Sequence, residues 1–300
     1  MQINFIKKLP IPISGLILAI LSLGNILQQY NLIFKLLCGI IGCILILMLV
    51  LKLIFYPKNI KDDLSNSIIL SNSGTFSMAL MILSTYLNAF DGTLAICVWI
   101  LGIALHILLI TYFTYRYICH NFNINGVYPS YWIVYIGITM GAITAHVHGL
   151  SEIGFIFFLF GFIAMLITLP LVIYRYFKYP NKSEANKPLI CIFTAVMSIL
   201  IVGYTNSANV ISTEFLIILY SIAFAFFLFA FSKVIEYRKL KFYPSYSAFT
   251  FPFVITAIAS KEVSQIFNNW IFNIIIPIQT IIAIILVMYV FYRYIKFLTL

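Results

Sequence analysis

Long apolar stretches alternate with short polar connections along the whole chain. Ten of these stretches can each form a helix of about 20 residues, the length that crosses the hydrocarbon core of a membrane. We expect charged side chains to lie in the connections and not inside the spans. The expected spans are Leu9–Leu27, Leu36–Phe55, Ser65–Asn88, Thr93–Tyr115, Pro129–Gly149, Ile153–Tyr174, Pro188–Ser207, Phe215–Ile235, Pro244–Ser260 and Asn268–Tyr292.

The composition agrees with this pattern. Hydrophobic residues make up 63% of the chain and charged residues 9%, whereas a soluble domain is about half apolar and a quarter charged. We therefore expect an all-α integral membrane protein, with residues 1–300 forming a single transmembrane domain. The net charge of +10 would suggest a nucleic-acid partner in a soluble protein, but here membrane topology explains it and no nucleic acid is expected.

The basic residues are distributed unevenly between the two sides of the predicted helices. Of the 18 lysine and arginine residues, all except Lys35 and Lys261 fall on the side that holds both termini. Cytoplasmic segments carry an excess of such residues. We expect a multi-pass protein of the cell inner (cytoplasmic) membrane, in contact with membrane lipids and with both termini in the cytoplasm.

Two short motifs recur at related spacings. Tyr-Arg-Tyr occurs at 115–117, 174–176 and 292–294, so the arginines are 59 and then 118 residues apart. Tyr-Pro-Ser-Tyr occurs at 128–131 and again at 243–246. These intervals indicate a repeating unit made of one helical hairpin, used five times in the same orientation. The plainer interpretation of Tyr-Arg-Tyr, which we favour, is an aromatic belt at the membrane edge.

Repeats of one orientation are related by an axis along the membrane normal. Five hairpins around such an axis predict a pseudo-five-fold arrangement with a central pore. The odd-numbered spans hold far more Gly, Ala, Ser and Thr than the even-numbered spans. Small residues allow close helix packing or line a cavity, so the odd spans are expected inside. The alternative is that they mark helix contacts without any conducting centre.

Few residues carry recognisable chemistry. His106 is interpreted as a packed, hydrogen-bonded histidine, and His146 with His148 as too few ligands for a metal site. No nucleophile or phosphate-binding loop is evident, so we expect no enzyme, no catalytic residue, no metal and no cofactor. Four carboxylates in the outer connections form either a cation-attracting ring or, as we favour, ordinary loop residues; they are Asp91, Glu152, Glu214 and Glu262.

A proline lies well inside the ninth span. Pro252 removes a backbone hydrogen bond, so the helix is expected to kink or break there. Its position also disfavours regular helix at the preceding residue, Phe251. A broken helix is tolerated in a membrane only beside protein or a water-lined cavity. This segment is therefore the candidate for a functional site.

These residues resemble those of a known family. Ala-Phe-Thr-Phe-Pro at 248–252, Pro-Ile-Ser-Gly-Leu at 12–16 and Leu-Ser-Leu-Gly at 21–24, together with the ten expected helices, are similar to the tellurite-resistance/dicarboxylate transporter family. That family includes bacterial TehA, yeast malate permease and the plant slow anion channel. The resemblance implies five hairpins around a pore lined by the odd helices, in a homotrimer.

The resemblance also implies a gate. In the family one ninth-helix phenylalanine occludes the pore, which carries over to Phe251. Candidate pore-lining or kink positions are Gly15, Gly74, Gly137, Thr250 and Pro252.

The leading functional hypothesis is a gated anion channel or passive anion transporter for inorganic or small organic anions. The alternatives are a carrier for C4-dicarboxylates such as malate or for oxyanions such as tellurite, and an exporter of lipophilic cations. Because no charge is expected inside the spans, a passive pathway is favoured over a proton-coupled one.

Overall fold

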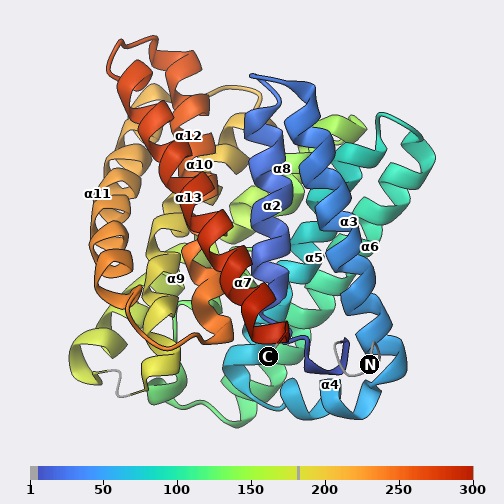
Figure 1. The fold of residues 1–300 in the computed structure, drawn as a ribbon. Helices are drawn as coiled ribbons and strands as arrows, with labels where there is room; N and C mark the ends of the chain where they lie inside the picture. Colours follow the sequence, from blue (N-terminus) through green and yellow to red (C-terminus); the bar gives the residue numbers. More distant parts are fainter. Residues whose placement is uncertain (1–5, 181–182, 300) are drawn as a thin grey trace.

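The computed structural model describes residues 6–180 and 183–299 of the chain. Across these ranges the secondary structure is helical and contains no strand (Figure 1). The outer surface is formed by long helices, one at the end of each predicted hairpin. They are α3 (Leu32–Phe55), α6 (Gly92–Phe113, continued by the π-helical η1, Thr114–His120), α9 (Ser151–Lys178), α11 (Thr213–Tyr237) and α13 (Phe272–Thr299).

The inner segments are shorter or interrupted. Two are continuous helices, and three change helix type or are interrupted by a few non-helical residues. They are α2 (Ile13–Leu27), α5 (Ser67–Leu87), α7 (Ser130–Tyr135) with α8 (Thr139–Ala145) and η3 (His146–His148), η4 (Glu184–Ile192) with α10 (Phe193–Ser207), and η5 (Pro244–Phe249) with α12 (Phe251–Phe267). Two short connecting helices are α4 (Pro57–Asp63) and η2 (Ile124–Gly126).

Burial separates the two sets. The most apolar stretches of the outer helices are 28–33% buried, against 72% for α5 and 94% for η4–α10. Bulky aliphatic side chains on the outer helices face away from the protein, where lipid would lie, while small side chains allow the inner segments to approach closely. This burial confirms the prediction that the odd-numbered spans lie inside.

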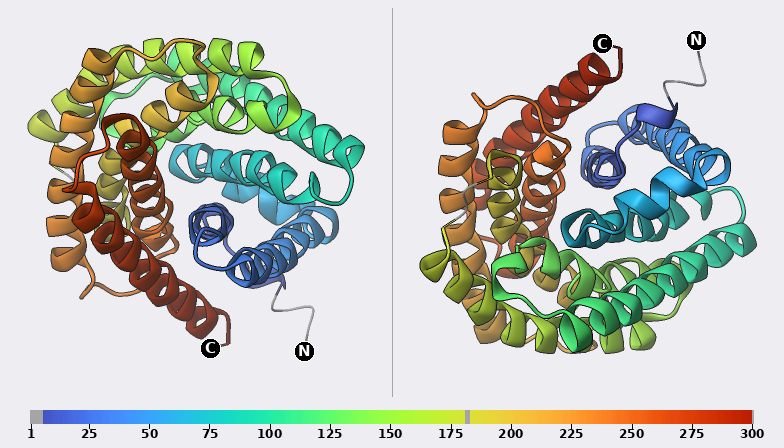
Figure 2. Two further views of the ribbon diagram at one scale, coloured as in Figure 1. Left: turned by 90° about the horizontal axis from the view of Figure 1, so that it is seen from above. Right: turned by 90° about the horizontal axis from the view of Figure 1, so that it is seen from below.

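The segments close into a ring (Figure 2). Each inner segment packs against the outer helix that follows it and against the next inner segment, and α12 returns to contact α2. Each outer helix also touches the inner segment of the next hairpin, with α13 reaching α2. The first and last hairpins are therefore neighbours, as the predicted cyclic arrangement requires.

Ten spans and pseudo-five-fold symmetry stay predictions. In the described ranges seven helices are long and apolar enough to cross a membrane, and α2 is a shorter apolar helix. Two of the expected spans are each formed by two successive helical elements and not by one continuous helix. The span 129–149 is shared between α7 and α8, and the span 244–260 between η5 and α12.

The expectation that spans contain no internal charge is wrong at Lys52. This residue is in the last turn of α3, and it is only 3% exposed. Its ammonium group forms an ion pair with Asp63 at 3.1 Å and donates to the carbonyl of Leu9 at 2.7 Å. A buried charge needs such partners. Lys233, also expected in a connection, lies inside α11, where it pairs with Glu236 at 2.7 Å.

Both termini lie at one end of the molecule, which we call the terminal face (Figure 1). Near this face Arg116 donates a hydrogen bond to the Tyr112 hydroxyl at 2.6 Å, and Arg293 donates to Tyr289 at 2.5 Å. Arg175 likewise lies against tyrosine rings. These contacts agree with an aromatic belt that holds arginines at the membrane edge. Lys182, counted among the basic residues of this side, lies outside the described residues.

The crossing of α5 and α6 should depend on Gly102. A side chain added there would begin 2.9 Å from the backbone carbonyl oxygen of Ser77. We expect Gly102→Leu to lower the free energy of unfolding by about 1–3 kcal/mol, because the backbone must move to admit it. The measurement is the thermal midpoint in detergent. Ala104→Leu, at an exposed position of the same helix, is the control and should change the midpoint little.

Candidate functional site

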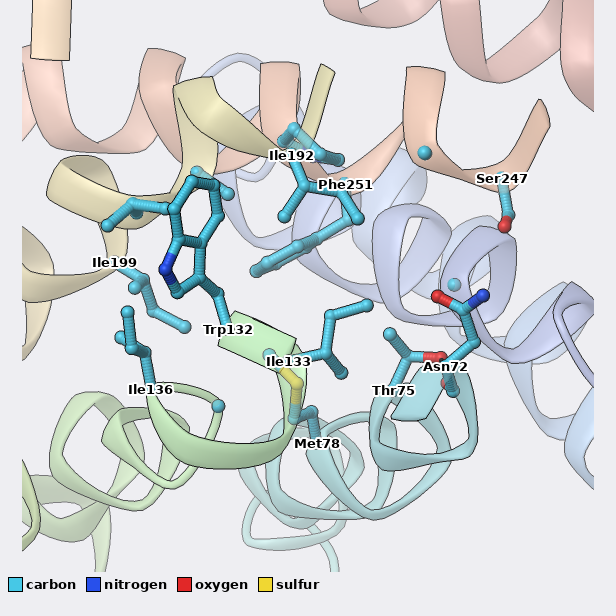
Figure 3. Close-up of a pocket in the computed structure, with 16 residues that line it drawn as sticks. Asn72, Thr75, Met78, Trp132, Ile133, Ile136, Ile192, Ile199, Ser247 and Phe251 are labelled. Atoms are coloured by element: carbon cyan, nitrogen blue, oxygen red, sulfur yellow. Dashed lines mark hydrogen bonds between the residues drawn. The ribbon is translucent and has the colours of Figure 1, made fainter. Parts of the chain in front are cut away.

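A small cavity lies at the centre of the ring (Figure 3). Its volume is about 50 Å³, room for only a few water molecules. Every inner segment contributes to its wall. The lining residues are Gly15, Asn72, Thr75, Met78, Trp132, Ile133, Ile136, Gly137, Ile192, Ala195, Val196, Ile199, Ser247, Ala248, Phe251 and Pro252.

The cavity wall is mainly apolar. None of these described lining residues is charged. Figure 3 places the polar side chains Asn72, Thr75 and Ser247 together on one side of the cavity. The Thr75 hydroxyl already has a hydrogen-bond partner, since it donates to the backbone carbonyl oxygen of Asn72 at 2.7 Å. An ion in this space would lose most of its hydration without meeting an opposite charge, which is strongly unfavourable.

The ring of Phe251 occupies the middle of the cavity (Figure 3). The backbone places it there through the expected break in the ninth span. The 3₁₀-helix η5 ends at Phe249, and α12 begins at Phe251. Between them Thr250 has φ −106° and ψ −84°, outside the helical region. Its hydroxyl donates to the carbonyl of Ser247 at 2.6 Å, which holds the break in place.

One detail of the expectation is wrong. Phe251 is not the irregular residue, because it is the first residue of α12 and the break lies one position earlier, at Thr250. Pro252 therefore lies in the first turn of a new helix. At that position its missing N–H has no helical partner to lose. The proline begins a helix here and does not bend one.

The other candidate residues divide into two groups. Gly15 and Gly137 line the cavity beside Phe251 and Pro252. Gly15 leaves room for Ser247, whose Cβ would lie 3.1 Å from an added side chain. Gly137 lies in the turn between α7 and α8, where an added Cβ would clash with the backbone carbonyl oxygen of Ile133.

Gly74 and Thr250 have other positions. Gly74 neither lines the central cavity nor interrupts α5, and its open side faces Leu109 and Ile133. Thr250 is fully buried at the break and is not among the cavity-lining residues.

His106 supports the interrupted segment from outside. Its Nε2 lies 3.1 Å from the carbonyl oxygen of Val134, and its Nδ1 lies 2.7 Å from the Ser77 hydroxyl. Because a carbonyl only accepts, Nε2 is the donor of the first bond. The histidine is fully buried, as the sequence interpretation expected, and it provides a partner for backbone near the turn between α7 and α8.

A wider space opens toward the terminal face. This terminal chamber has a volume of about 560 Å³ and shares Asn72 with the central cavity. Its wall is basic on balance, although Lys52 is paired with Asp63. The charged and amide side chains of its wall are Lys7, Lys8, Lys52, Asn59, Asp63, Asn66, Asn72 and Asn186.

A second space opens on the other side. This opposite chamber has a volume of about 250 Å³. Its wall includes Lys35, Lys261 and Glu262, so both basic residues of the far side are gathered there. Along α10, Val196 and Ile199 line the central cavity and Val202 lines this chamber. The three spaces therefore follow one another through the ring.

The outer carboxylates do not gather into one ring. Of the four, Glu262 lines the opposite chamber. Asp91 caps α6, accepting from the backbone N–H of Thr93 at 2.8 Å, and Glu214 accepts from the Ser212 hydroxyl at 2.9 Å. These contacts favour the interpretation of ordinary helix-end residues. In the part of the chain that the structure describes, no group of His, Cys, Asp and Glu could hold a metal ion.

Asn72 and Trp132 are among the cavity residues that sequence reasoning missed. Asn72 carries a polar amide inside a span without charged residues, and Trp132 follows directly after the first Tyr-Pro-Ser-Tyr motif. Polar side chains inside predicted spans were a usable signal for Asn72. Nothing in the sequence distinguished Trp132 from the other aromatic residues.

The fold and the cavity define a class: a multi-pass helical membrane protein with a ring of inner segments around a central cavity. A family model described as a voltage-dependent anion channel matches residues 9–295, so the chain belongs to the SLAC1 family. A search of curated proteins found no match. The match confirms the family resemblance drawn from residues 248–252 and the first span. Members of this family are anion channels and transporters, not enzymes.

The support from His106 can be tested by substitution. His106→Leu leaves the buried carbonyl of Val134 without this donor, and we expect a loss of about 1–3 kcal/mol in unfolding free energy. His120→Leu is the control, because His120 is exposed near the terminal face and its loss should change stability little. The measurement is the thermal midpoint of the two variants in detergent. Equal midpoints would show that the His106 contacts do not stabilise the fold.

Proposed function

We propose that this protein is a gated anion channel in which Phe251 closes the pathway. The route runs from the terminal chamber through the central cavity to the opposite chamber. One observation carries the proposal: the Phe251 ring fills the centre of an uncharged cavity to which every inner segment contributes. An apolar plug of this kind blocks ions by excluding the water that they need.

The local backbone supports a movable ring. Phe251 begins α12, so no preceding turn of the same helix restricts its side chain as it would in a helix interior. The neighbours Gly15 and Gly137 add no side-chain bulk to the cavity wall. Rotation of the ring toward either chamber would open the constriction without moving a helix.

The charge distribution supports anions as the permeating ions. Lys7 and Lys8 lie at the terminal chamber, and Lys35 and Lys261 at the opposite chamber. Basic residues at the two entrances raise the local anion concentration. The uncharged centre then selects among anions by their dehydration cost and not by tight binding. The terminal face is proposed to lie in the cytoplasm of a cell with this protein in its inner membrane.

The mode of transport is proposed to be passive. Proton-coupled transporters use ionisable groups inside the membrane, and none of the described residues that line the central cavity is ionisable in that way. Anion currents that do not depend on a proton gradient would agree with a channel. Saturable malate uptake that requires such a gradient would instead identify a carrier.

The protein is also proposed to form a homotrimer. This proposal rests on the family resemblance, and chemical cross-linking in membranes tests it.

The gate predicts the effect of one substitution. Phe251→Ala should raise anion conductance by at least about tenfold, since removing even 1.4 kcal/mol of barrier changes a rate by that factor. The measurement is the current through purified protein in planar bilayers, with chloride and nitrate as test anions. Truncation of a core phenylalanine typically costs about 3–5 kcal/mol of unfolding free energy. We expect Phe251→Ala to cost less, because the ring lies in a cavity.

Phe253→Ala provides the matched control. Phe253 is on the same helix, fully buried, with its ring 5.8 Å from that of Phe227. Its truncation should destabilise the protein without raising the current. The gate assignment is wrong if Phe251→Ala destabilises the protein in this manner and leaves the current unchanged.

A further inference from the structure

The indole N–H of Trp132 lacks a hydrogen-bond partner. The side chain is only 2% exposed, and it lines the central cavity. Figure 3 shows the indole nitrogen turned toward Ile199 and Ile136, with the Phe251 ring between the indole and Asn72. The free donor therefore lies on the side of Phe251 that faces away from the polar group formed by Asn72, Thr75 and Ser247.

The absence of a partner is unusual for a buried tryptophan, whose N–H normally finds one. Trp99 illustrates the usual case, since its Nε1 donates to the Thr144 hydroxyl at 2.8 Å. The Trp132 ring also packs edge-to-face with that of Phe193, with ring centroids 4.7 Å apart, which restricts its orientation. An oriented donor without a partner, at the wall of a cavity, is arranged to meet a ligand that accepts hydrogen bonds.

We propose that the Trp132 N–H is an anion-binding donor in the pore and that it favours the passage of anions over cations. This inference rests on the proposed function and adds to it a residue that determines specificity. With the Phe251 ring displaced, an anion in the cavity would accept a hydrogen bond from Nε1. The ligand class is a small monovalent anion such as chloride, nitrate or iodide.

The chemistry of indole explains the sign of the preference. The indole nitrogen donates and does not accept, so it can replace a water molecule around an anion but not around a cation. Hydrogen bonds to charged groups are stronger than neutral ones, and more so where water is scarce. The apolar wall formed by Ile136 and Ile199 offers little to compete with it. The donor thereby lowers the barrier for anions and leaves the barrier for cations unchanged.

The experiment uses the Phe251→Ala protein, in which the pathway is open. The ratio of chloride to sodium permeability is measured from reversal potentials in a salt gradient, with and without Trp132→Phe. We expect Trp132→Phe to lower this ratio by about tenfold, the size of one hydrogen bond to a charged group. Trp99→Phe in the same background is the matched control and should leave the ratio unchanged.

A second variant guards against a change of packing. Replacing Trp132 with benzothienylalanine removes the N–H but keeps the size and shape of the bicyclic ring. It should lower the permeability ratio as Trp132→Phe does. A fall with phenylalanine but not with benzothienylalanine would assign the effect to ring size and overturn the donor role.

Two failures are distinguishable. Without anion current through Phe251→Ala, the proposed function fails and this inference fails with it. If that protein conducts anions and both Trp132 replacements leave the chloride-to-sodium ratio unchanged, the gate stands and the role of Trp132 is overturned.

Discussion

Backbone polar groups inside a membrane need hydrogen-bond partners, and this requirement governs where the chain departs from regular helix. The interruptions between α7 and α8 and between η5 and α12 both lie in the inner ring. There, neighbouring segments supply partners, as His106 does for Val134. The outer helices that would face lipid stay helical along their length, even where α9 and α13 contain Pro170 and Pro277 and where α6 passes into the π-helical η1. An outer ring of continuous helices is thus the condition for an irregular centre.

The irregular centre in turn positions the functional groups. A residue in a helix interior points back along its own helix, whereas Phe251 follows a break and projects into the axis of the ring. The shallow turn at Gly137 brings Trp132 and Ile136 to the same cavity. Among the residues that line the three spaces, the charged ones lie in the two chambers, and the central cavity between them is lined mainly by apolar side chains.

Much of the architecture could be predicted because it depends on solvent preference alone. Long apolar stretches predicted the outer helices well, as for α3 (Leu32–Phe55) against an expected start at 36, although α13 ends at Thr299 and not at the expected Tyr292. The break near Pro252 followed from the missing N–H of proline. The burial of Lys52 could not be predicted, since its partners Asp63 and Leu9 are brought to it by tertiary packing. The unpaired N–H of Trp132 is equally a property of its surroundings, which no local pattern encodes.

The closure of the ring has a consequence for the order of the hairpins along the chain. Because α13 and α12 contact α2 and both termini lie on one face (Figure 1), the first hairpin is as much a neighbour of the last as of the second. The order in which hairpins leave the ribosome is then not imposed by the finished structure. A circularly permuted chain, joined across the termini and opened in the connection around α4, would keep the same packing partners throughout. The packing of the described helices is therefore cyclic, although the chain that forms it is linear.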